Sequence, residues 1–320
     1  MTVCNGLNPF LIFILFKKKQ RYLMIKKYYL PCIFLILFSL HIGSLGAQES
    51  FRFVFMSDVH YHDKNDAPRA MDAAIDTINK LNPDFILVGG DIVYDALRRT
   101  QGDAEEQASL FLEKAAKLEA PLYYAIGNHD HFAVYDRKTG VDHPLFGKQF
   151  YEKYFGPRYY SFDHRGWHFI ALDDMVLTED RSYEGRVDSL QLEWLRKDLE
   201  QVADTTPVTV MVHVPLITTL SQWYGGGTKP NSNKIAIENS GEVVELFKDK
   251  NLRLILQGHI HYYEVLHILN KTTVISAPSF SGKWWMGKMN EMEKGFVVID
   301  VKGDQIVDYH VVEYHTAPTH

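Results

Sequence analysis

The sequence predicts an α/β domain, and two observations support this. From Phe51 onward, apolar runs of strand length alternate with amphipathic stretches of helix length. The 320-residue chain, 46% hydrophobic, is long enough to bury a substantial core, and it shows no internal repeat, low-complexity tract or evident linker. Alternation of this kind is typical of an α/β layout, and short strands dominate its later part.

The first half of the domain contains the clearest elements. Asp66 is the expected cap of the first helix, and Asn82-Pro83 is its expected stop. The run Asp84–Gly90 is continuously apolar up to its glycines, which is typical of a strand buried on both faces. We expect strands at Phe51–Met56, Asp84–Gly90 and Leu122–Ile126, and helices at Pro68–Lys80 and Ala104–Leu118.

The second half becomes richer in strands. A hairpin is expected around His164-Arg165-Gly166, and the Gly-rich segment Ser221–Asn233 is expected to be a surface loop. In order, the remaining elements are strands at Tyr159–Phe162 and Trp167–Leu172, a helix at Ser189–Val202, a strand at Val208–Val214, a helix at Glu242–Lys248, a strand at Leu252–Leu256, and short strands from Glu264 that include Gly295–Val301 and Gln305–Val312.

Residues 1–47 are expected to be a leader that precedes a single domain at residues 48–320. A basic start at Met24–Lys27 is followed by an apolar run from Leu30 to Leu40 and small residues at Gly43–Ala47. This is the layout of a secretory signal, and the apolar run is shorter than the roughly 20 residues of a membrane-spanning helix. We expect translation to start at Met24 and the mature chain to be exported, periplasmic or extracellular. An uncleaved anchor and a lipidated Cys32 are the alternatives.

Composition limits the partners. Both cysteines, Cys4 and Cys32, lie in the leader, so the mature chain would use no thiolate metal ligands. Loss of the six Lys/Arg of the leader takes the formal net charge from −6 to about −12. We expect no binding of polymeric nucleic acid, because that depends on neutralising phosphates with Lys and Arg. We also expect no stable membrane insertion after leader cleavage.

Polar side chains follow the C-terminal ends of five apolar strands. In open α/β sheets, ligands bind outside the carboxyl ends of the strands, so these side chains are expected to meet. They are Asp58 and His60, then Asp91, then Asn128, His129 and Asp130, then His213, and finally His259 and His261.

The chemistry of this set suits two divalent cations. Imidazole binds Zn, Fe and Mn well, and carboxylate and amide oxygens suit the harder of these ions. In Asp58-x-His60 and His259-x-His261, alternation along an extended segment puts both side chains on one face. Asp91 follows a central strand and could bridge two ions. Two ions roughly 3.5–4 Å apart would activate a shared water and clamp a phosphoryl group.

The five motifs together resemble the calcineurin-like metallophosphoesterase superfamily. They are D-x-H at 58–60, G-G-D at 89–91, G-N-H-D at 127–130, a lone His at 213 and G-H-x-H at 258–261, in the order found in the family. The resemblance implies an α/β four-layer sandwich of two mixed β-sheets flanked by helices, with the metals at one edge. Within the family, the single-domain layout is most similar to the cyclic-nucleotide phosphodiesterase-like branch.

The resemblance also implies roles for the residues. His129 would protonate the leaving oxygen, and Asp130 would orient it, because an imidazolium beside a carboxylate can deliver a proton near neutral pH. His131 has no implied role and is expected at the surface. One ion would be held by Asp58, His60, Asp91 and His261, and the other by Asp91, Asn128, His213 and His259.

Aromatic residues near these motifs are candidates for substrate contacts. Trp284 and Trp285 could form a stacking wall for a base or an apolar leaving group, and core packing is the alternative. The loop that contains Trp223 could shape the same pocket. Tyr94 resembles the iron-binding tyrosine of purple acid phosphatases, but His60 stands where those enzymes have glycine. We therefore expect Tyr94 to pack or to line a pocket.

The segment at 63–66 (Asp-Lys-Asn-Asp) superficially suggests a calcium loop. It lacks the glycine and glutamate of an EF-hand, so a solvated turn is expected.

The predicted function is hydrolysis of a small phosphate ester with two divalent ions (Mn, Fe or Zn). A phosphodiester is favoured, with attack by a metal-bridging hydroxide and His129 as the general acid. The ions and Asn128 would stabilise the charge of the pentacoordinate phosphorus. Phosphomonoester hydrolysis, as by a nucleotidase or an acid phosphatase, is one alternative. A catalytically silent metal-binding or ligand-binding domain is the alternative from another class.

Overall fold

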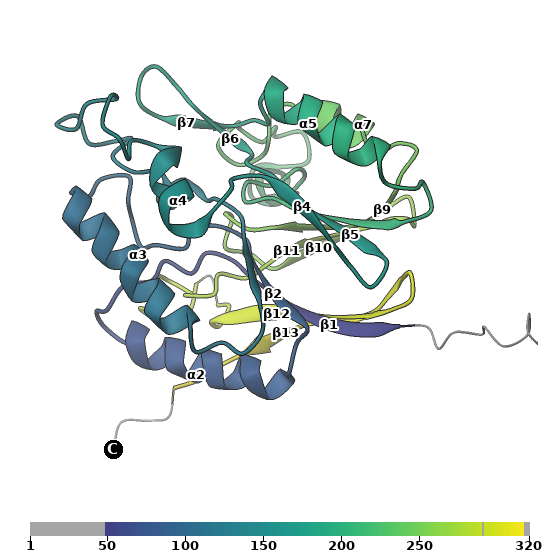
Figure 1. Ribbon diagram of the computed structural model, residues 1–320, viewed down its shortest axis with the longest axis horizontal. Helices are drawn as coiled ribbons and strands as arrows, with labels where there is room; N and C mark the ends of the chain where they lie inside the picture. Colours follow the sequence, from purple (N-terminus) through teal and green to yellow (C-terminus); the bar gives the residue numbers. More distant parts are fainter. Residues whose placement is uncertain (1–48, 290, 317–320) are drawn as a thin grey trace, which may run out of the picture. The chain divides into compact units, whose positions relative to one another are not determined.

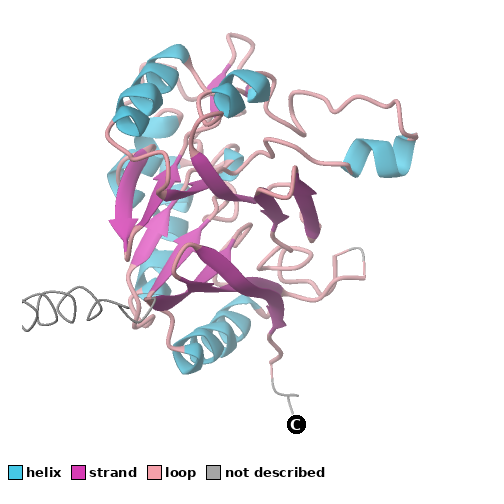
Figure 2. Cartoon of the chain, turned by 90° about the vertical axis from the view of Figure 1, so that its right-hand side faces the viewer, coloured by secondary structure: helices cyan, strands magenta, loops and turns pink. Residues whose placement is uncertain are grey.

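The computed structural model describes residues 49–289 and 291–316, and the predicted leader lies outside them. Two large mixed β-sheets face each other, and helices cover the outer side of each (Figure 1, Figure 2). The first sheet consists, in spatial order, of β13 (Gln305–Glu313), β12 (Gly295–Lys302), β1 (Ser50–Met56), β2 (Phe85–Val88) and β3 (Leu122–Tyr124). The second consists of β10 (Glu264–Ile268), β11 (Thr272–Ser276), β9 (Asn251–Gln257), β8 (Pro207–Met211), β5 (Trp167–Ala171) and β4 (Tyr160–His164).

The helices and a small hairpin complete the domain. The helices are α2 (Ala67–Leu81), α3 (Gln101–Ala115), α4 (Lys148–Phe155), α5 (Ser189–Glu200), α6 (Leu220–Gly225) and α7 (Ser240–Glu245), with a 3-10 turn, η1, at Asn128–Asp130. The hairpin pairs β6 (Met175–Leu177) with β7 (Tyr183–Gly185). Among the described residues, no helix has the length and hydrophobicity needed to cross a membrane.

Three hydrophobic cores account for the four layers. One lies between the sheets, one between the first sheet and α2 and α3, and one between the second sheet and α5 and α7. Strand β1 contributes to two of them, because its side chains alternate between its faces: Phe53 and Phe55 enter the core between the sheets, whereas Val54 and Met56 pack under the helices. This double burial explains the continuous apolar runs, and the predicted four-layer fold is confirmed.

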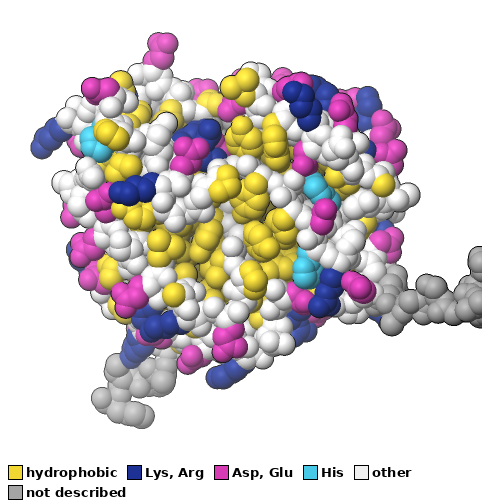
Figure 3. All heavy atoms as spheres, in the orientation of Figure 1, with side chains coloured by type: hydrophobic (Ala, Val, Ile, Leu, Met, Phe, Trp, Pro, Cys, Tyr) yellow, Lys and Arg dark blue, Asp and Glu magenta, His cyan; other side chains and the backbone are white. Residues whose placement is uncertain are grey.

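Aromatic side chains also join the sheets at one open edge. The rings of Tyr123 on β3 and Phe162 on β4 stack with centroids 3.8 Å apart and planes 6° apart. Hydrophobic side chains gather near the middle of this side of the molecule, between α4 and β4 (Figure 3). The contact between Tyr123 and Phe162 links the edge strands of the two sheets.

Parallel pairing determines where the site lies. Strands β1, β2 and β3 are parallel, and so are β5, β8, β9 and β11. The carboxyl ends of each parallel set therefore lie at one edge of its sheet, and the loops that follow these strands carry the chemistry.

Several local predictions differ from the structure. Helix α3 begins at Gln101, because the side chain of Thr100 accepts a hydrogen bond from the N–H of Asp103. Asp66 stands at the start of α2, but its carboxylate pairs with Arg69 and Lys294 and caps no helix N–H. Helices α4 and α6 and the hairpin β6–β7 were not predicted, because segments of three to eight residues give little periodicity.

Candidate metal centre

The structure brings all seven predicted metal-ligating side chains together. The ligand atoms fall into three overlapping groups, and within each group they lie within 4.8 Å of one another. The groups are Asp58, His60 and His261; His60, Asp91 and His129; and Asp91, His213 and His259. The seventh residue, Asn128, joins through its Oδ1 atom, which lies 3.2 Å from Nε2 of His213.

The first half of the cluster is built around Asp58. Its Oδ1 atom lies 3.1 Å from Nε2 of His261, and the Nε2 atoms of His60 and His261 are 3.2 Å apart. Nε2 of His60 is also 3.6 Å from Oδ2 of Asp91. The Nδ1 atoms of both rings are buried and have no hydrogen-bond partner among the residues that the structure describes. Two imidazole lone pairs and two carboxylates around one point fit a divalent cation.

The second half is held in place by backbone carbonyls. Nδ1 of His213 lies 2.7 Å from the carbonyl oxygen of Gly89, which directs Nε2 toward Asp91, 3.3 Å away. His259 is turned the other way: its Nε2 lies 2.7 Å from the carbonyl oxygen of Lys234, so Nδ1 faces the cluster. Such a hydrogen bond fixes the tautomer of a metal-ligating histidine. The donor set therefore fits a second divalent ion.

The ligand-bearing loops adopt an unusual backbone conformation. Asp58, His60, Asp91, His259 and His261 all have positive φ, between 46° and 68°. This left-handed region is uncommon for residues with a side chain, and each visit costs roughly 1–2 kcal/mol. Five such residues at the ends of three strands show that the loops are bent to aim side chains at a common point.

The motif glycines make room for these bends. A Cβ atom on Gly127 would lie 2.0 Å from the backbone nitrogen of Asp91, and one on Gly258 would lie 1.9 Å from Oγ of Ser57. Both distances are far below van der Waals contact, and the blocking atoms belong to the loops that carry Asp91 and Asp58. The glycines of G-N-H-D and G-H-x-H are therefore needed for close approach between neighbouring strand ends.

Electrostatics favour a cation here. Burial would raise the pKa of Asp58, but the neighbouring imidazoles of His261 and His213 lower it to about 2. Burial would lower the pKa of His213, but the charge of Asp91 raises it to about 10. The same anions that attract a proton to His213 attract a metal ion. Burial and His213 lower the pKa of His259 to about 4, which keeps that ring neutral, as a ligand must be.

His129 borders the cluster and is positioned by the backbone. Its Nδ1 lies 2.9 Å from the carbonyl oxygen of Tyr94, its backbone N–H donates to Oδ1 of Asp91 at 2.7 Å, and its ring meets that of His60 edge-on at 4.7 Å. Its Nε2 makes no hydrogen bond to any described residue, and its side chain is 20% exposed. This nitrogen is the one available to a substrate.

The prediction that Asp130 orients His129 is wrong. The Asp130 carboxylate is fully buried and accepts hydrogen bonds from the backbone N–H groups of Ile92, Val93 and Gly127 at 2.9, 3.1 and 2.9 Å. It therefore ties the loop after β2 to the loop after β3. Burial and the charge of Asp91 raise the pKa of Asp130 to about 7.

The carboxylate next to the His129 ring belongs instead to Asp95, which sequence reasoning missed. Its Oδ1 lies 3.8 Å from Nδ1 of His129 and is buried without a hydrogen bond. Its position four residues after the G-G-D aspartate, on the same loop, was the available signal.

His131 was also placed wrongly. It is fully buried rather than at the surface, and its Nδ1 lies 2.9 Å from the carbonyl oxygen of Gly127. Two further carboxylates that the sequence did not point to, Asp173 and Asp174, follow β5. Asp173 is held by Lys148 at 2.6 Å, and both side-chain oxygens of Asp174 are buried.

The three predicted substrate tryptophans have three different environments. Trp284 lies against the cluster, with its ring 5.1 Å from His261 and 5.6 Å from His60. Trp285 is 2% exposed, and its indole N–H donates to the carbonyl oxygen of His60 at 2.9 Å, so it is a core residue and the proposed substrate contact is wrong. Trp223 is 81% exposed on α6, at a cavity of about 210 Å³ that it shares with Ile260.

Comparisons with known proteins agree with this geometry. The family profile described as Calcineurin-like phosphoesterase matches residues 51–263. A Rhodococcus erythropolis protein named probable cyclic nucleotide phosphodiesterase is 24% identical over 226 residues, 65% of this chain and 64% of its own length. A Xenorhabdus bovienii protein with a similar name is 25% identical over 227 residues, 71% of this chain and 78% of its own length. This chain thus covers slightly less than two thirds of the Rhodococcus protein.

Two further comparisons extend the range. Purple acid phosphatase 15 of Arabidopsis thaliana is 28% identical over 215 residues, which cover 59% of this chain and 37% of that protein. The solved structure of a dimetal phosphatase from Danio rerio superimposes with a TM-score of 0.57 at 12% identity, covering 83% of this chain and 99% of the other. At that identity the superposition shows a shared fold. Together with the profile match over most of the domain, the strand-end cluster shows that the chain belongs to the calcineurin-like phosphoesterase family.

Proposed function

We propose that this chain is a metal-dependent phosphodiesterase that hydrolyses small phosphate esters. The observation that carries the proposal is the meeting of seven metal-ligating side chains beside His129, whose Nε2 is open to a substrate. The names of the Rhodococcus and Xenorhabdus relatives support a diester substrate.

The residues divide the work between binding and proton transfer. The site would hold two divalent ions (Mn, Fe or Zn). Asp58, His60 and His261 would bind the first ion, and Asp91 would contact both ions. The second ion would be held by Asp91, Asn128, His213 and His259. When bound, the ions would polarise the phosphoryl group of the substrate and activate a water molecule.

His129 would donate a proton from Nε2 to the departing oxygen. The carbonyl of Tyr94 holds the opposite ring nitrogen at 2.9 Å, so Nδ1 carries the hydrogen of that bond and only Nε2 is free to exchange a proton with substrate. Trp284, which lies against two of the ligand rings, would contact the organic part of the ester.

The test compares substrates and leaving groups. We expect the full chain, loaded with Mn²⁺, to cleave bis(p-nitrophenyl) phosphate faster than p-nitrophenyl phosphate. The variant His129→Ala should retain its metal content and lose roughly 10²–10⁴-fold in kcat for diesters with an alkoxide leaving group, because such groups need protonation. The loss should be smallest for p-nitrophenolate, which departs without a proton.

Controls separate the alternatives. His310→Ala, which changes a histidine on β13 that pairs only with Asp308, should keep full activity. Faster cleavage of the monoester would favour the phosphomonoesterase alternative, to which the Arabidopsis relative points by name. Retention of metal without cleavage of either ester would show a silent binding domain and contradict the proposal.

We also propose that the mature protein is exported, on the basis of the signal-like layout of residues 1–47. Amino-terminal sequencing of the protein from the extracellular or periplasmic fraction should begin near residue 48. A protein that keeps its leader in the cytoplasmic fraction would contradict this.

A further inference from the structure

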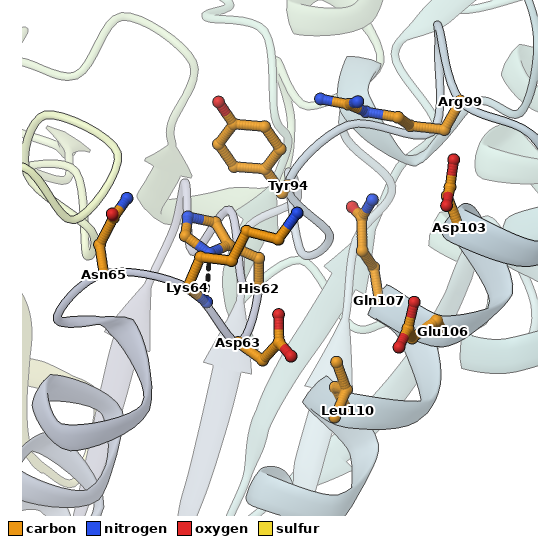
Figure 4. A pocket seen from close by; sticks show the side chains of 10 residues that line it. All are labelled: His62, Asp63, Lys64, Asn65, Tyr94, Arg99, Asp103, Glu106, Gln107 and Leu110. Atoms are coloured by element: carbon orange, nitrogen blue, oxygen red, sulfur yellow. Dashed lines mark hydrogen bonds between the residues drawn. The ribbon is translucent and has the colours of Figure 1, made fainter.

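A cavity of about 280 Å³ lies beside two of the loops that carry metal-ligand candidates (Figure 4). Two of its walls continue the loops that carry metal ligands: His62 follows His60 by two residues, and Tyr94 follows Asp91 by three. Tyr94 also supplies the carbonyl that holds the ring of His129. Helix α3 forms the third wall.

Two cations in this cavity have no ion-pair partner among the described residues. Lys64 and Arg99 make no salt bridge, although acidic residues outnumber basic ones in the chain by 40 to 34. In Figure 4 the Lys64 ammonium and the Arg99 guanidinium extend into the space beside the Tyr94 ring. The Arg99 guanidinium carbon lies 5.8 Å from the centre of that ring.

A third donor lies at the same end. Nδ1 of His62 accepts a hydrogen bond from the backbone N–H of Lys64 at 2.9 Å, so the neutral ring carries its proton on Nε2. The ring packs edge-on against Tyr94 at 4.7 Å, which fixes its orientation.

The opposite end of the cavity has the opposite sign. Asp103 and Glu106 project from α3, away from the loops that carry metal ligands (Figure 4). Asp63, which lies between His62 and Lys64 in the chain, is a third carboxylate in the lining. An anion is therefore attracted to the space beside the Tyr94 ring, into which Lys64 and Arg99 extend (Figure 4).

We propose that Lys64, Arg99 and His62 form a subsite for a second anionic group of the substrate, a carboxylate or a phosphate borne by its organic part. The inference rests on the proposed phosphoesterase function and names the class of ester: one whose phosphodiester binds the metal centre while a second anion sits beside Tyr94. It also provides the local attraction that an acidic protein needs for an anionic substrate.

The test uses p-nitrophenyl phosphodiesters that share one leaving group. Their second alcohol is a simple alkyl chain, the same chain ending in a carboxylate, or the same chain ending in a phosphonate, with linkers of about two to five methylenes to scan the reach. We expect kcat/KM for the best anionic ester to exceed that of its neutral counterpart roughly tenfold, the order expected for charge-assisted hydrogen bonds. The carboxylate and phosphonate arms decide which anion the subsite prefers.

Variants locate the effect. The double variant Lys64→Met/Arg99→Gln should reduce the ratio of kcat/KM for the anionic ester to kcat/KM for the neutral ester to about one. Its kcat/KM for the neutral ester should not change. Lys302→Met, which removes an exposed lysine far along the chain on β12, should leave the ratio unchanged. Glu106→Gln should raise the ratio, because it removes a repelling charge; a lower ratio would indicate a cationic or zwitterionic ligand and overturn the proposal.

Binding provides a readout independent of turnover. Calorimetric titration of the metal-loaded chain with non-hydrolysable phosphonate analogues of the same series should show the same preference and the same loss in the double variant. Cleavage of the neutral ester without any anionic preference would overturn the subsite and leave the phosphodiesterase proposal intact. Preferential binding of the anionic analogue without cleavage of any ester would support the subsite and contradict the phosphodiesterase proposal.

Discussion

His129 illustrates how backbone and side chain share the positioning of one ring. A carbonyl fixes its Nδ1, and the nearby carboxylate of Asp95 would attract the positive charge of the ring in its proposed role as an acid. The adjacent Asp130, which sequence order suggested as the partner of the ring, instead accepts hydrogen bonds from three backbone N–H groups.

Replacement of Asp95 tests this arrangement. Asp95→Asn should lower kcat roughly tenfold for esters with alkoxide leaving groups and change p-nitrophenolate esters little, because only the former need the proton. Metal content should stay at the level of the unaltered chain. Arg98→Gln, which removes the Asp95 partner at 3.7 Å and keeps the carboxylate, is the control and should behave normally. Equal losses for both classes of ester would assign Asp95 a purely structural role.

Neighbouring residues show what a sequence cannot reveal at this scale. Trp284 and Trp285 are identical side chains one position apart, and both have positive φ, yet one borders the metal ligands and the other is buried against Tyr61 and Phe280. The sequence pattern does not predict whether a side chain in an irregular loop points into the core or toward the site, because such a loop lacks the period of a helix or strand. The ligands could be predicted since each follows a recognisable strand.

At the scale of elements, the loop after β9 must pass within contact of the loop after β1. Gly258 allows this, and Gly258→Ala should therefore displace the two loops and lower the metal content toward one ion or none per chain, measured by elemental analysis. Gly241→Ala in α7, where an added Cβ meets nothing within 4 Å, is the matched control. Full metal content in Gly258→Ala would show that the loops can separate without loss of the ligand set.

A second element-scale contact links β4, β5 and α5 through His168. Its Nδ1 lies 2.6 Å from Asp163 and its Nε2 lies 2.8 Å from Asp198. Burial would lower the pKa of His168, but these two hydrogen bonds raise it above its usual value. A histidine with a raised folded-state pKa stabilises the fold fully below its unfolded pKa of roughly 6.5, and the contribution is lost as the pH rises through the folded value.

The pH dependence of unfolding checks this contact. The free energy of unfolding, measured by urea denaturation between pH 5 and pH 9, should fall less steeply with rising pH in His168→Gln than in the unaltered chain. His315→Gln, which changes an exposed histidine, should leave the slope unchanged. Identical slopes in all three proteins would show that His168 binds its proton equally in both states.

At the scale of the whole molecule, the candidate metal ligands come from both sheets. Asp58, Asp91 and Asn128 follow strands of the first sheet, whereas His213, His259 and His261 follow strands of the second. Ions held by both sets bind the folded state and not the separated sheets, so they stabilise the sandwich by mass action.

Thermal unfolding measures this linkage. Mn²⁺ at about 100 times its dissociation constant should contribute roughly 2.7 kcal/mol, raise the midpoint by several degrees, and be reversed by a chelator. Asp91→Ala should abolish the response, and Asp76→Asn, an exposed change on α2, should preserve it. A response that persists in Asp91→Ala would remove Asp91 from the shared position between the ions.

The α/β class and the strand-end cluster followed from the sequence because long apolar runs and their polar ends are local signals, whereas the four layers came from the resemblance carried by the motifs. The order of strands within the sheets, the buried position of His131 and the cavity beside Tyr94 did not follow, since each depends on which distant loops meet. The segment at 63–66, expected to be an ordinary solvated turn, supplies a cation to that cavity.

The left-handed backbone at five ligand positions makes activity and robustness compete. Glycine would relax each of these positions and at the same time delete a donor atom. A lineage released from selection for catalysis could therefore drift toward glycine at the strand ends and gain a sturdier fold as it lost its chemistry. In this chain, aspartate and histidine occupy these positions and lower the stability of the fold.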